Sequence, residues 1–308
     1  MSASLRSYLL LGLTVLVWGY NWVPLKIAAV AVDPYWLSAW RVAGGAATLF
    51  VVLAFSRRNA APPPGRAYLG IGLTQVAGLV IFSTLALRFG NVATVTALIF
   101  TMPLWTAVFA YFLLGETLSR MRIAWLLVAL AGIALIGSEV RSASDIIGAV
   151  FATLGGASWA LGNVLQRRAG YTIDSVRLVA WQQLAAAAPL VLIALVLGHV
   201  TARLDAGVIA ASIFAAVVGS GIAWLWWGIV LRALPANTVA LGSFAIPVVA
   251  ALAAWTQLGT PPAPLTAIGL TIVVAGLAGS VLVAGLTAGD QTGESGKSVG
   301  VPRPLGTR

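Results

Sequence analysis

Residues 9–32 read LLLGLTVLVWGYNWVPLKIAAVAV, an apolar run that carries an asparagine, a proline and two tryptophans. About 20 predominantly apolar residues are enough to cross a bilayer. The run is longer than the core of a signal peptide and does not end in a small-residue cleavage site. We therefore interpret it as a retained membrane span.

The rest of the chain has the same apolar character. Of its 308 residues, 60% are hydrophobic and only 8% are charged, with a mean hydropathy of +0.99. Soluble domains carry about 25% charged residues, so this composition indicates an integral membrane protein. The net charge of +10 lies mainly in short loops between apolar runs, which is typical of membrane topology and gives no reason to expect a nucleic-acid partner. With no cysteine and one histidine, His199, in a predicted loop, we expect no metal site and no cofactor.

Apolar runs between charged or proline-rich breaks predict an all-α membrane protein with ten transmembrane helices. The runs cover residues 7–30, 34–55, 66–87, 91–114, 121–138, 145–167, 176–197, 207–231, 237–258 and 264–286. Residues 287–308 are rich in Gly, Ser and Pro, and we predict a disordered cytoplasmic tail there.

The two halves of the chain resemble each other at a nearly constant spacing. At an offset of 141 residues the matches include Trp18 with Trp159, Lys26 with Arg167 and Trp40 with Trp181, and at an offset of 144 they include Arg88 with Arg232, Pro103 with Pro247 and Gly132 with Gly276. We therefore predict two five-helix repeats, residues 7–138 and 145–286. Because five is odd, the second repeat enters the membrane from the opposite side, as in the inverted repeats of secondary transporters.

Basic residues give the expected orientation of the chain. With the N-terminus inside, thirteen Lys and Arg residues lie on the cytoplasmic side and four on the outer side. Cytoplasmic loops carry the excess of Lys and Arg. Both termini are therefore predicted to be cytoplasmic.

Three stretches carry a resemblance to a known family. They are VWGYNWVPLK (17–26), LSAWRVAGGAATL (37–49) and TALIFTMPLWTAVFAYFLLGETLSRMRIAWLLVALAGIALI (96–136). They resemble the EamA-type transporters of the drug/metabolite transporter superfamily, over about residues 8–286. The third stretch is the most specific, with a mid-span proline, a Gly-Glu pair that closes the span, and a helix of small residues. The second half keeps Pro247 and Gly259 but has Thr260 where Glu116 stands.

The resemblance implies both a fold and a function. The fold is a ten-helix basket in which spans 1–4 and 6–9 surround a central cavity and spans 5 and 10 pack outside. The implied function is the export, or sometimes the import, of amino acids and other small metabolites. The implied location is the inner (plasma) membrane of a bacterium.

Polar residues in the first and sixth spans need surroundings other than lipid. An unpaired amide in hydrocarbon costs several kcal/mol, so Asn21 and Asn163 must face protein or water. Each shares a helix face with a tryptophan, and the two spans, entering from opposite sides, would meet near the bilayer middle, where such transporters bind substrate. The alternative is that both amides only bond to neighbouring helices. The predicted substrate-binding residues are Trp18, Asn21, Trp22, Gln75, Thr101, Trp105, Trp159, Asn163 and Gln166.

Three further residues are candidates for a gate or for binding a substrate carboxylate. Trp40 and Trp181 are repeat mates near opposite surfaces, so we expect them to line gates. Arg41 lies inside the second span, and a charge within the membrane is a functional hypothesis by default. We expect Arg41 to hold a substrate carboxylate or to lock the outer gate, unless its long side chain reaches the outer interface.

Prolines interrupt several spans. Pro24, Pro103 and Pro247 each remove a backbone donor and are predicted to kink their helices. A kink beside a cavity provides either a hinge for alternating access or fixed curvature.

Acidic residues are predicted only in loops and at span ends. No carboxylate is expected at mid-membrane, where a proton relay would need one. Glu116 is expected to neutralise nearby Arg120 or Arg122, and the sequence has no Walker motif for ATP. These features favour facilitated diffusion or exchange.

The sequence therefore predicts a secondary transporter that exports small amphipathic metabolites by alternating access. Amino acids are the first candidates, because a cavity of indoles and amides without acids suits a zwitterion with an apolar side chain. An importer or exchanger of another metabolite, such as a sugar or nucleoside, is the alternative, and a channel or membrane enzyme is a more distant one. The chain lacks a cluster of catalytic groups, so we do not expect an enzyme. The expected partners are a small-molecule substrate and the lipid bilayer, for a monomer or weak homodimer.

Overall fold

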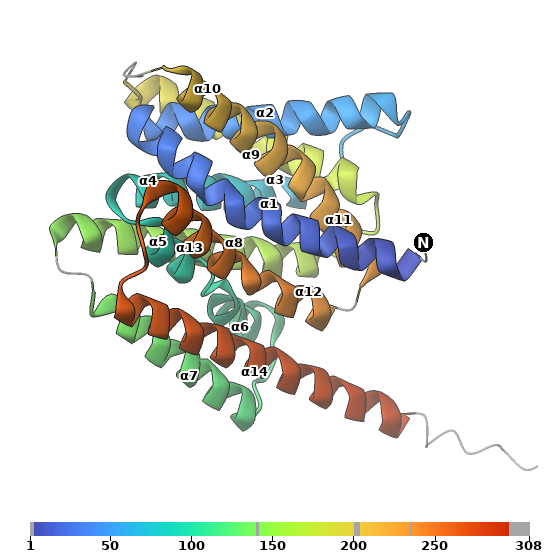
Figure 1. Ribbon diagram of the computed structural model, residues 1–308. Coiled ribbons are helices and arrows are strands. Elements are labelled where there is room, and N and C mark those ends of the chain that lie inside the picture. Colours follow the sequence, from blue (N-terminus) through green and yellow to red (C-terminus); the bar gives the residue numbers. More distant parts are fainter. Residues whose placement is uncertain (1–2, 140–141, 200–203, 235, 296–308) are drawn as a thin grey trace, which may run out of the picture.

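The structure, a computed structural model, describes residues 3–139, 142–199, 204–234 and 236–295. This part of the chain is helical and contains no strand (Figure 1). It contains ten helical spans that are long and apolar enough to cross a membrane. In chain order the helices are α1 (Ala3–Ala31), α2 (Pro34–Phe55), α3 (Ala67–Ile71), η1 (Gly72–Gly78), α4 (Leu79–Phe89), α5 (Val92–Ile99), α6 (Met102–Leu114), α7 (Arg120–Gly137), α8 (Ala143–Ala169), α9 (Ser175–Leu197), α10 (Ala206–Ile213), η2 (Phe214–Ile222), α11 (Ala223–Ala233), α12 (Ala236–Ser243), α13 (Ala245–Leu258) and α14 (Pro264–Ser295).

The ten predicted spans are confirmed, with ends that differ by a few residues. α14 continues through Ser295, past residue 287, where the tail was predicted to begin. Residues 296–308 of the predicted tail lie outside the described residues.

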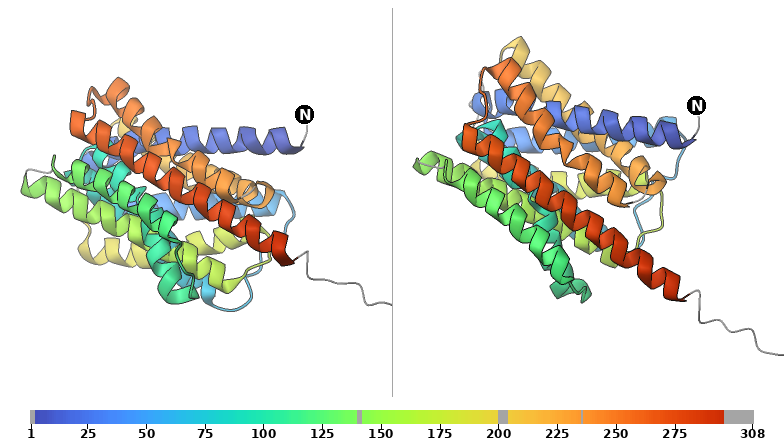
Figure 2. Two further views of the ribbon diagram at one scale, coloured as in Figure 1. Left: turned by 90° about the horizontal axis from the view of Figure 1, so that it is seen from below. Right: turned by 60° about the horizontal axis from the view of Figure 1, so that its bottom comes forward.

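The two halves run through the bundle in opposite directions. α1 begins at the end of the bundle where α8, the first helix of the second half, finishes (Figure 1). We call this end the N-terminal face and the opposite end the far face. α7 and α14, the fifth span of each half, lie side by side at the edge of the bundle (Figure 2), as the resemblance implied. Small residues allow this contact, because a Cβ on Gly276 would lie 2.4 Å from the backbone nitrogen of Ala129.

Two of the three predicted proline kinks coincide with breaks between helices. α5 ends at Ile99, four residues before Pro103, and α12 ends at Ser243, four residues before Pro247. The proline ring clashes with the carbonyl four residues earlier and supplies no donor for it. α1, by contrast, stays helical through Pro24.

The third and eighth spans each contain a π-helix that the sequence did not predict. η1 lies between α3 and α4, and η2 lies at the corresponding place between α10 and α11. π-Helical turns leave carbonyls for other donors and are frequent at functional sites. Here the carbonyl of Thr74 in η1 accepts from the Ser158 hydroxyl at 2.8 Å, and the carbonyl of Gly219 in η2 accepts from Trp18 Nε1 at 3.0 Å.

The second spans of the two halves, α2 and α9, pack along each other and are tied to loops at both faces. Asp33 caps α2 and accepts from the His199 backbone N–H at 3.2 Å, at the far face. Its repeat mate Asp174 caps α9 and forms an ion pair with Arg58 at 2.8 Å, at the N-terminal face. These contacts fix the helices that carry Arg41 and Gln182.

Candidate functional site

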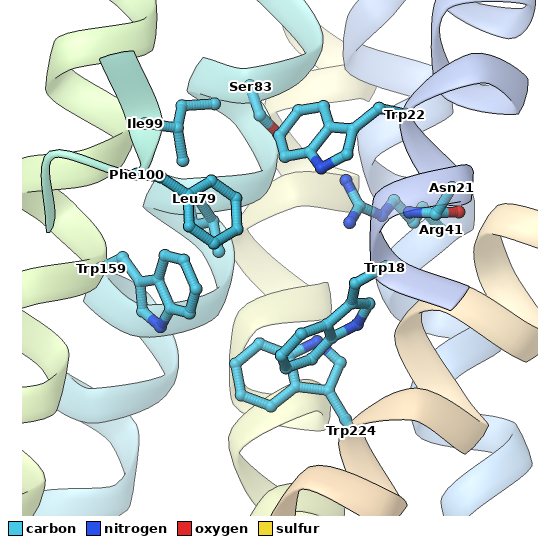
Figure 3. Close-up of a pocket in the computed structure, with 10 residues that line it drawn as sticks. All are labelled: Trp18, Asn21, Trp22, Arg41, Leu79, Ser83, Ile99, Phe100, Trp159 and Trp224. Atoms are coloured by element: carbon cyan, nitrogen blue, oxygen red, sulfur yellow. The ribbon is translucent and has the colours of Figure 1, made fainter. Parts of the chain in front are cut away.

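Two adjoining cavities lie between the halves. The smaller has a volume of about 40 Å³, and the larger, of about 350 Å³, extends toward the N-terminal face. Trp159 and Trp224 line both cavities, so they form the boundary between them. The small cavity is lined by Trp18, Asn21, Trp22, Arg41, Leu79, Ser83, Ile99, Phe100, Trp159 and Trp224 (Figure 3). The large cavity is lined by Gln75, Met102, Trp159, Asn163, Gln166, Arg167, Tyr171, Ser175, Leu178, Val179, Gln182, Trp224, Trp227 and Gly228.

A cluster of indoles separates the two cavities. The Trp18 ring lies 5.3 Å from Trp224, 5.1 Å from Trp227 and 6.5 Å from Trp159, measured between ring centroids. Edge-to-face and tilted contacts at these distances are favourable for aromatic pairs. Of the tryptophans in the run 224–227, Trp224 and Trp227 line the cavities. This agrees with the limit of one or two that a single helix face allows.

Two amides in the site lie directly on glycines of the opposite half. A Cβ on Gly219 would lie 2.5 Å from Asn21 Oδ1, and a Cβ on Gly162 would lie 2.4 Å from Gln75 Cβ. At the repeat offsets, Gly162 matches Asn21 and Gly219 matches Gln75. The first half therefore contributes both amides, and the second half contributes both glycines, at the positions that match the amides in the repeat.

Arg41 is buried at the small cavity, with 7% of its surface exposed. Its Nε donates to Ser220 Oγ in η2 at 2.9 Å. Its Nη1 is buried without a partner among the described residues. Figure 3 shows the guanidinium between Trp22 and Trp18. The side chain therefore does not extend to the outer interface, which was the alternative left open by its length.

The large cavity contains two pairs of amides. Gln75 Nε2 donates to Asn163 Oδ1 at 2.5 Å, and Gln182 Nε2 donates to Gln166 Oε1 at 3.2 Å. The Oε1 atoms of Gln75 and Gln182 are buried without a partner in the described part of the chain. An unpaired buried acceptor is costly, so these oxygens are available to donors from a ligand or from water.

The two ends of the site differ. At the far face Lys26 Nζ donates to the carbonyls of Leu87 and Gly90 at 2.6 and 2.8 Å, which ties α1 to the end of α4. At the N-terminal face Arg167 lines the large cavity and pairs with Glu116 at 3.0 Å. Glu116 was expected to neutralise Arg120 or Arg122; it does interact with the charge of Arg122, but its ion pair is with an arginine of the opposite half.

Four predicted site residues line neither cavity. Thr101 donates to the Leu98 carbonyl of its own helix end, and Trp105 stacks on Phe109. Trp40 is 54% exposed on the outer surface of α2. Trp181 Nε1 donates to the Ala60 carbonyl in the loop after α2.

Sequence reasoning also missed residues that the site uses. Ser220, in the π-helix η2, accepts a hydrogen bond from Arg41. Trp227, in α11, lines the large cavity. Gln182, which lines the large cavity, could have been found from the sequence. It matches Arg41 at the 141-residue offset, so both halves have a polar residue at an equivalent depth. The expectation that the ninth span surrounds the cavity also needs correction, because no described residue of α12 or α13 lines either one.

The groups that line the cavities are suited to binding. Indoles and carboxamides offer apolar faces and hydrogen bonds, and two guanidinium groups offer positive charge, of which that of Arg167 is paired with Glu116. Within the described residues, no group of three or more His, Cys, Asp or Glu side chains is placed to hold a metal ion.

Comparison with known proteins agrees with this architecture. The family model described as "EamA-like transporter family" matches twice, over residues 5–138 and 146–282. Relatives from Salmonella typhimurium and Escherichia coli, each named "Probable amino-acid metabolite efflux pump", are 27% and 25% identical, and each match covers 86% of this chain and 91% of the relative. A crystal structure with 23% identity superposes with a TM-score of 0.67 over 92% of this chain and 99% of its own, which shows the shared fold. The chain is a multi-pass membrane protein and belongs to the EamA-like transporter family.

Proposed function

We propose that this protein is a secondary transporter that exports small amphipathic metabolites, with amino acids as the first candidates. The observation that carries the proposal is a cavity between two inverted halves that reaches one face and is closed toward the other. Alternating access needs two such halves, which rock around a central site. The described conformation corresponds to one of the two states of that cycle.

The substrate class is proposed from the lining of the cavities. About 350 Å³ is within the range of about 300–1,000 Å³ for small-molecule sites. Five indoles provide apolar faces, and the amides of Gln75 and Gln182 provide free acceptors. The relatives named as amino-acid metabolite efflux pumps support the same class and the direction of export.

The remaining features of the proposal follow from charge. The excess of Lys and Arg makes the N-terminal face cytoplasmic, in the inner membrane of a bacterium. The large cavity then faces the cytoplasm, as an exporter awaiting substrate requires. Because the acidic residues of the sequence are confined to loops and span ends, facilitated diffusion or exchange is favoured over proton coupling. The protein acts as a carrier and not as an enzyme, as a monomer or weak homodimer.

Counterflow tests this proposal. Purified protein is reconstituted into liposomes loaded with an amino-acid pool, and uptake of labelled amino acids is followed with and without a pH gradient. Saturable uptake that Trp159→Ala removes is the expected result. Trp255→Ala is the matched control, because Trp255 is 54% exposed on the bundle surface. Stimulation by the gradient would contradict the absence of proton coupling, and no flux of any amino acid by a folded preparation would contradict the substrate class.

A further inference from the structure

We propose that Arg41 binds a carboxylate of the transported molecule in the small cavity, so that the protein selects small carboxylic acids, amino acids among them. The inference rests on the proposed function in one respect only, that the ligand is the transported molecule. It adds which group is recognised, by which residue, and in which of the two cavities.

The positive charge of Arg41 is not compensated by a carboxylate of the described part of the chain. Arginine keeps its proton in proteins, so Arg41 is a fixed cation. The two ion pairs in the described part of the chain join Arg58 to Asp174 and Arg167 to Glu116. None of its carboxylates pairs with Arg41, although only 7% of this residue is exposed. A buried cation without an anion is costly, and a ligand that brings a negative charge relieves that cost.

The guanidinium of Arg41 is held in one orientation. Ser220 Oγ accepts from Arg41 Nε at 2.9 Å, and the Ser220 carbonyl accepts from Gln183 Nε2 at 2.8 Å. Gln183 and Ser220 are both buried. This chain of contacts occupies Nε and leaves Nη1 without a partner beside the small cavity. A fixed guanidinium with a free edge suits a planar carboxylate.

The small cavity has room for only one end of a ligand. The small cavity, of about 40 Å³, has room for a few water molecules or for one small polar group. It cannot hold a whole metabolite, but it adjoins the large cavity at Trp159 and Trp224. A ligand with its carboxylate on Arg41 therefore passes its apolar body between these indoles into the large cavity.

Arg41 and its match in the other half of the chain differ in charge. The repeat mate of Arg41 is Gln182, which lines the large cavity and is fully buried. The unpaired cation is thus at the small cavity, whereas the large cavity has a neutral amide at the equivalent position and a cation, Arg167, that is already paired with Glu116. This asymmetry orients the ligand, with its anionic group toward the far face and its neutral part toward the N-terminal face.

Binding by compounds that share one apolar body tests the proposal. The probes are L-leucine, 4-methylpentanoate, L-leucinamide and 3-methylbutylamine, with the same sets built on alanine and phenylalanine, titrated into the full chain in lipid nanodiscs. Tryptophan fluorescence reports binding, because four indoles line the small cavity. We expect the compounds with a carboxylate to bind at least tenfold more tightly than their amide and amine counterparts.

Variants assign this preference to Arg41. Arg41→Gln is expected to remove the preference for carboxylates, and Arg41→Lys is expected to retain part of it. Glutamine is already present at the equivalent position 182, so the first variant is compatible with the helix packing. Arg66→Gln is the matched control, because Arg66 is exposed in the loop before α3. It should leave the preference unchanged.

Several outcomes would overturn the assignment. Equal binding of acids and amides would do so, as would a carboxylate preference that survives in Arg41→Gln, or no binding by any carboxylate in the panel. If sodium chloride alone produced the same fluorescence change, and no carboxylate bound more tightly than chloride, the site would bind only an inorganic counter-ion. Counterflow separates this proposal from the broader one: transport unchanged by Arg41→Gln keeps the carrier and overturns the site. Arg41-dependent binding without counterflow keeps the site and overturns the carrier.

Discussion

The two ends of the bundle use the same basic position in different ways. At the far face Lys26 donates to two carbonyls at the end of α4, which holds the first and third spans together. At the N-terminal face its repeat mate Arg167 pairs with Glu116, and the large cavity separates α8 from α11. Thr260 stands at the position equivalent to Glu116, so the sequence itself makes the two ends unlike. A pair of similar halves can thus be closed at one face and hollow at the other.

The middle of the molecule also shows a difference between the halves, because the first half supplies the amides and the second half supplies the glycines that they contact. Asn21 lies on Gly219 at one side of the site, and Gln75 lies on Gly162 at the other. The contacts differ in what a larger residue would meet. At Gly219 it would meet the end of a side chain, whereas at Gly162 it would meet the backbone of Gln75 as well. The two glycines are therefore not equally tolerant of a larger residue.

The largest predicted effect uses this difference. Gly162→Ala would place its Cβ 2.4 Å from Gln75 Cβ and 2.6 Å from Gln75 N, so η1 must move away from α8. Overpacking of this kind costs about 1–3 kcal/mol. We expect a clearly lower unfolding midpoint in detergent and loss of transport. Gly219→Ala should lower the midpoint less, because the Asn21 amide can turn. Equal midpoints for the two variants would contradict the comparison.

The next effect concerns the closed end. Lys26→Met removes the donor to the carbonyls of Leu87 and Gly90. Hydrogen bonds to charged groups contribute about 1.5–3 kcal/mol, and because Lys26 is only partly buried, we expect the two bonds together to contribute toward the lower end of that range. We expect the far end to open more often. Ser83 lines the small cavity and is 1% exposed. A cysteine at position 83 should react faster with an impermeant maleimide from the far face in Lys26→Met than in Lys26→Arg. The same rate in both variants would show that this contact does not close the far end.

The smallest effect concerns the open end. The Arg167 and Glu116 side chains are 49% and 38% exposed, and exposed ion pairs contribute about 0–1 kcal/mol. Glu116→Ala should therefore leave the unfolding midpoint nearly unchanged. Asp174→Ala is the matched control, because its ion pair is equally exposed but Asp174 also caps α9. Losing a helix cap costs about 1 kcal/mol. If the unfolding midpoint fell further in Glu116→Ala than in Asp174→Ala, the ion pair of Glu116 with Arg167 would contribute more to stability than an exposed ion pair should.

Much of the fold could be predicted from the sequence, because lipid makes the requirement for apolar residues strict. The ten spans and the two halves followed from run lengths and from matches such as Trp18 with Trp159. The breaks before Pro103 and Pro247 followed from the chemistry of proline. These features depend on local sequence, which a single chain contains in full.

The candidate site was less predictable, because it depends on contacts between distant segments. The π-helices that carry Gln75 and Ser220 have no local signal that separates them from α-helix. The pairing of Glu116 with Arg167 joins the two halves, whereas sequence proximity favoured Arg120. Trp105 and Thr101 were placed in the cavity by depth alone, but Trp105 in α6 stacks on Phe109, and Thr101, in the turn before α6, donates to the carbonyl of Leu98 at the end of α5.

In the proposed cycle, one cavity between the halves opens to one face at a time. The chain has no cysteine, so a single Val179→Cys reports on the large cavity without background. Its labelling by an impermeant maleimide would be compared in right-side-out and inside-out membrane vesicles, with Ala129→Cys, buried between α7 and α14, as the negative control. The account predicts labelling from the N-terminal face at least tenfold faster than from the far face. Equal rates from both faces, or no labelling from the N-terminal face, would contradict it.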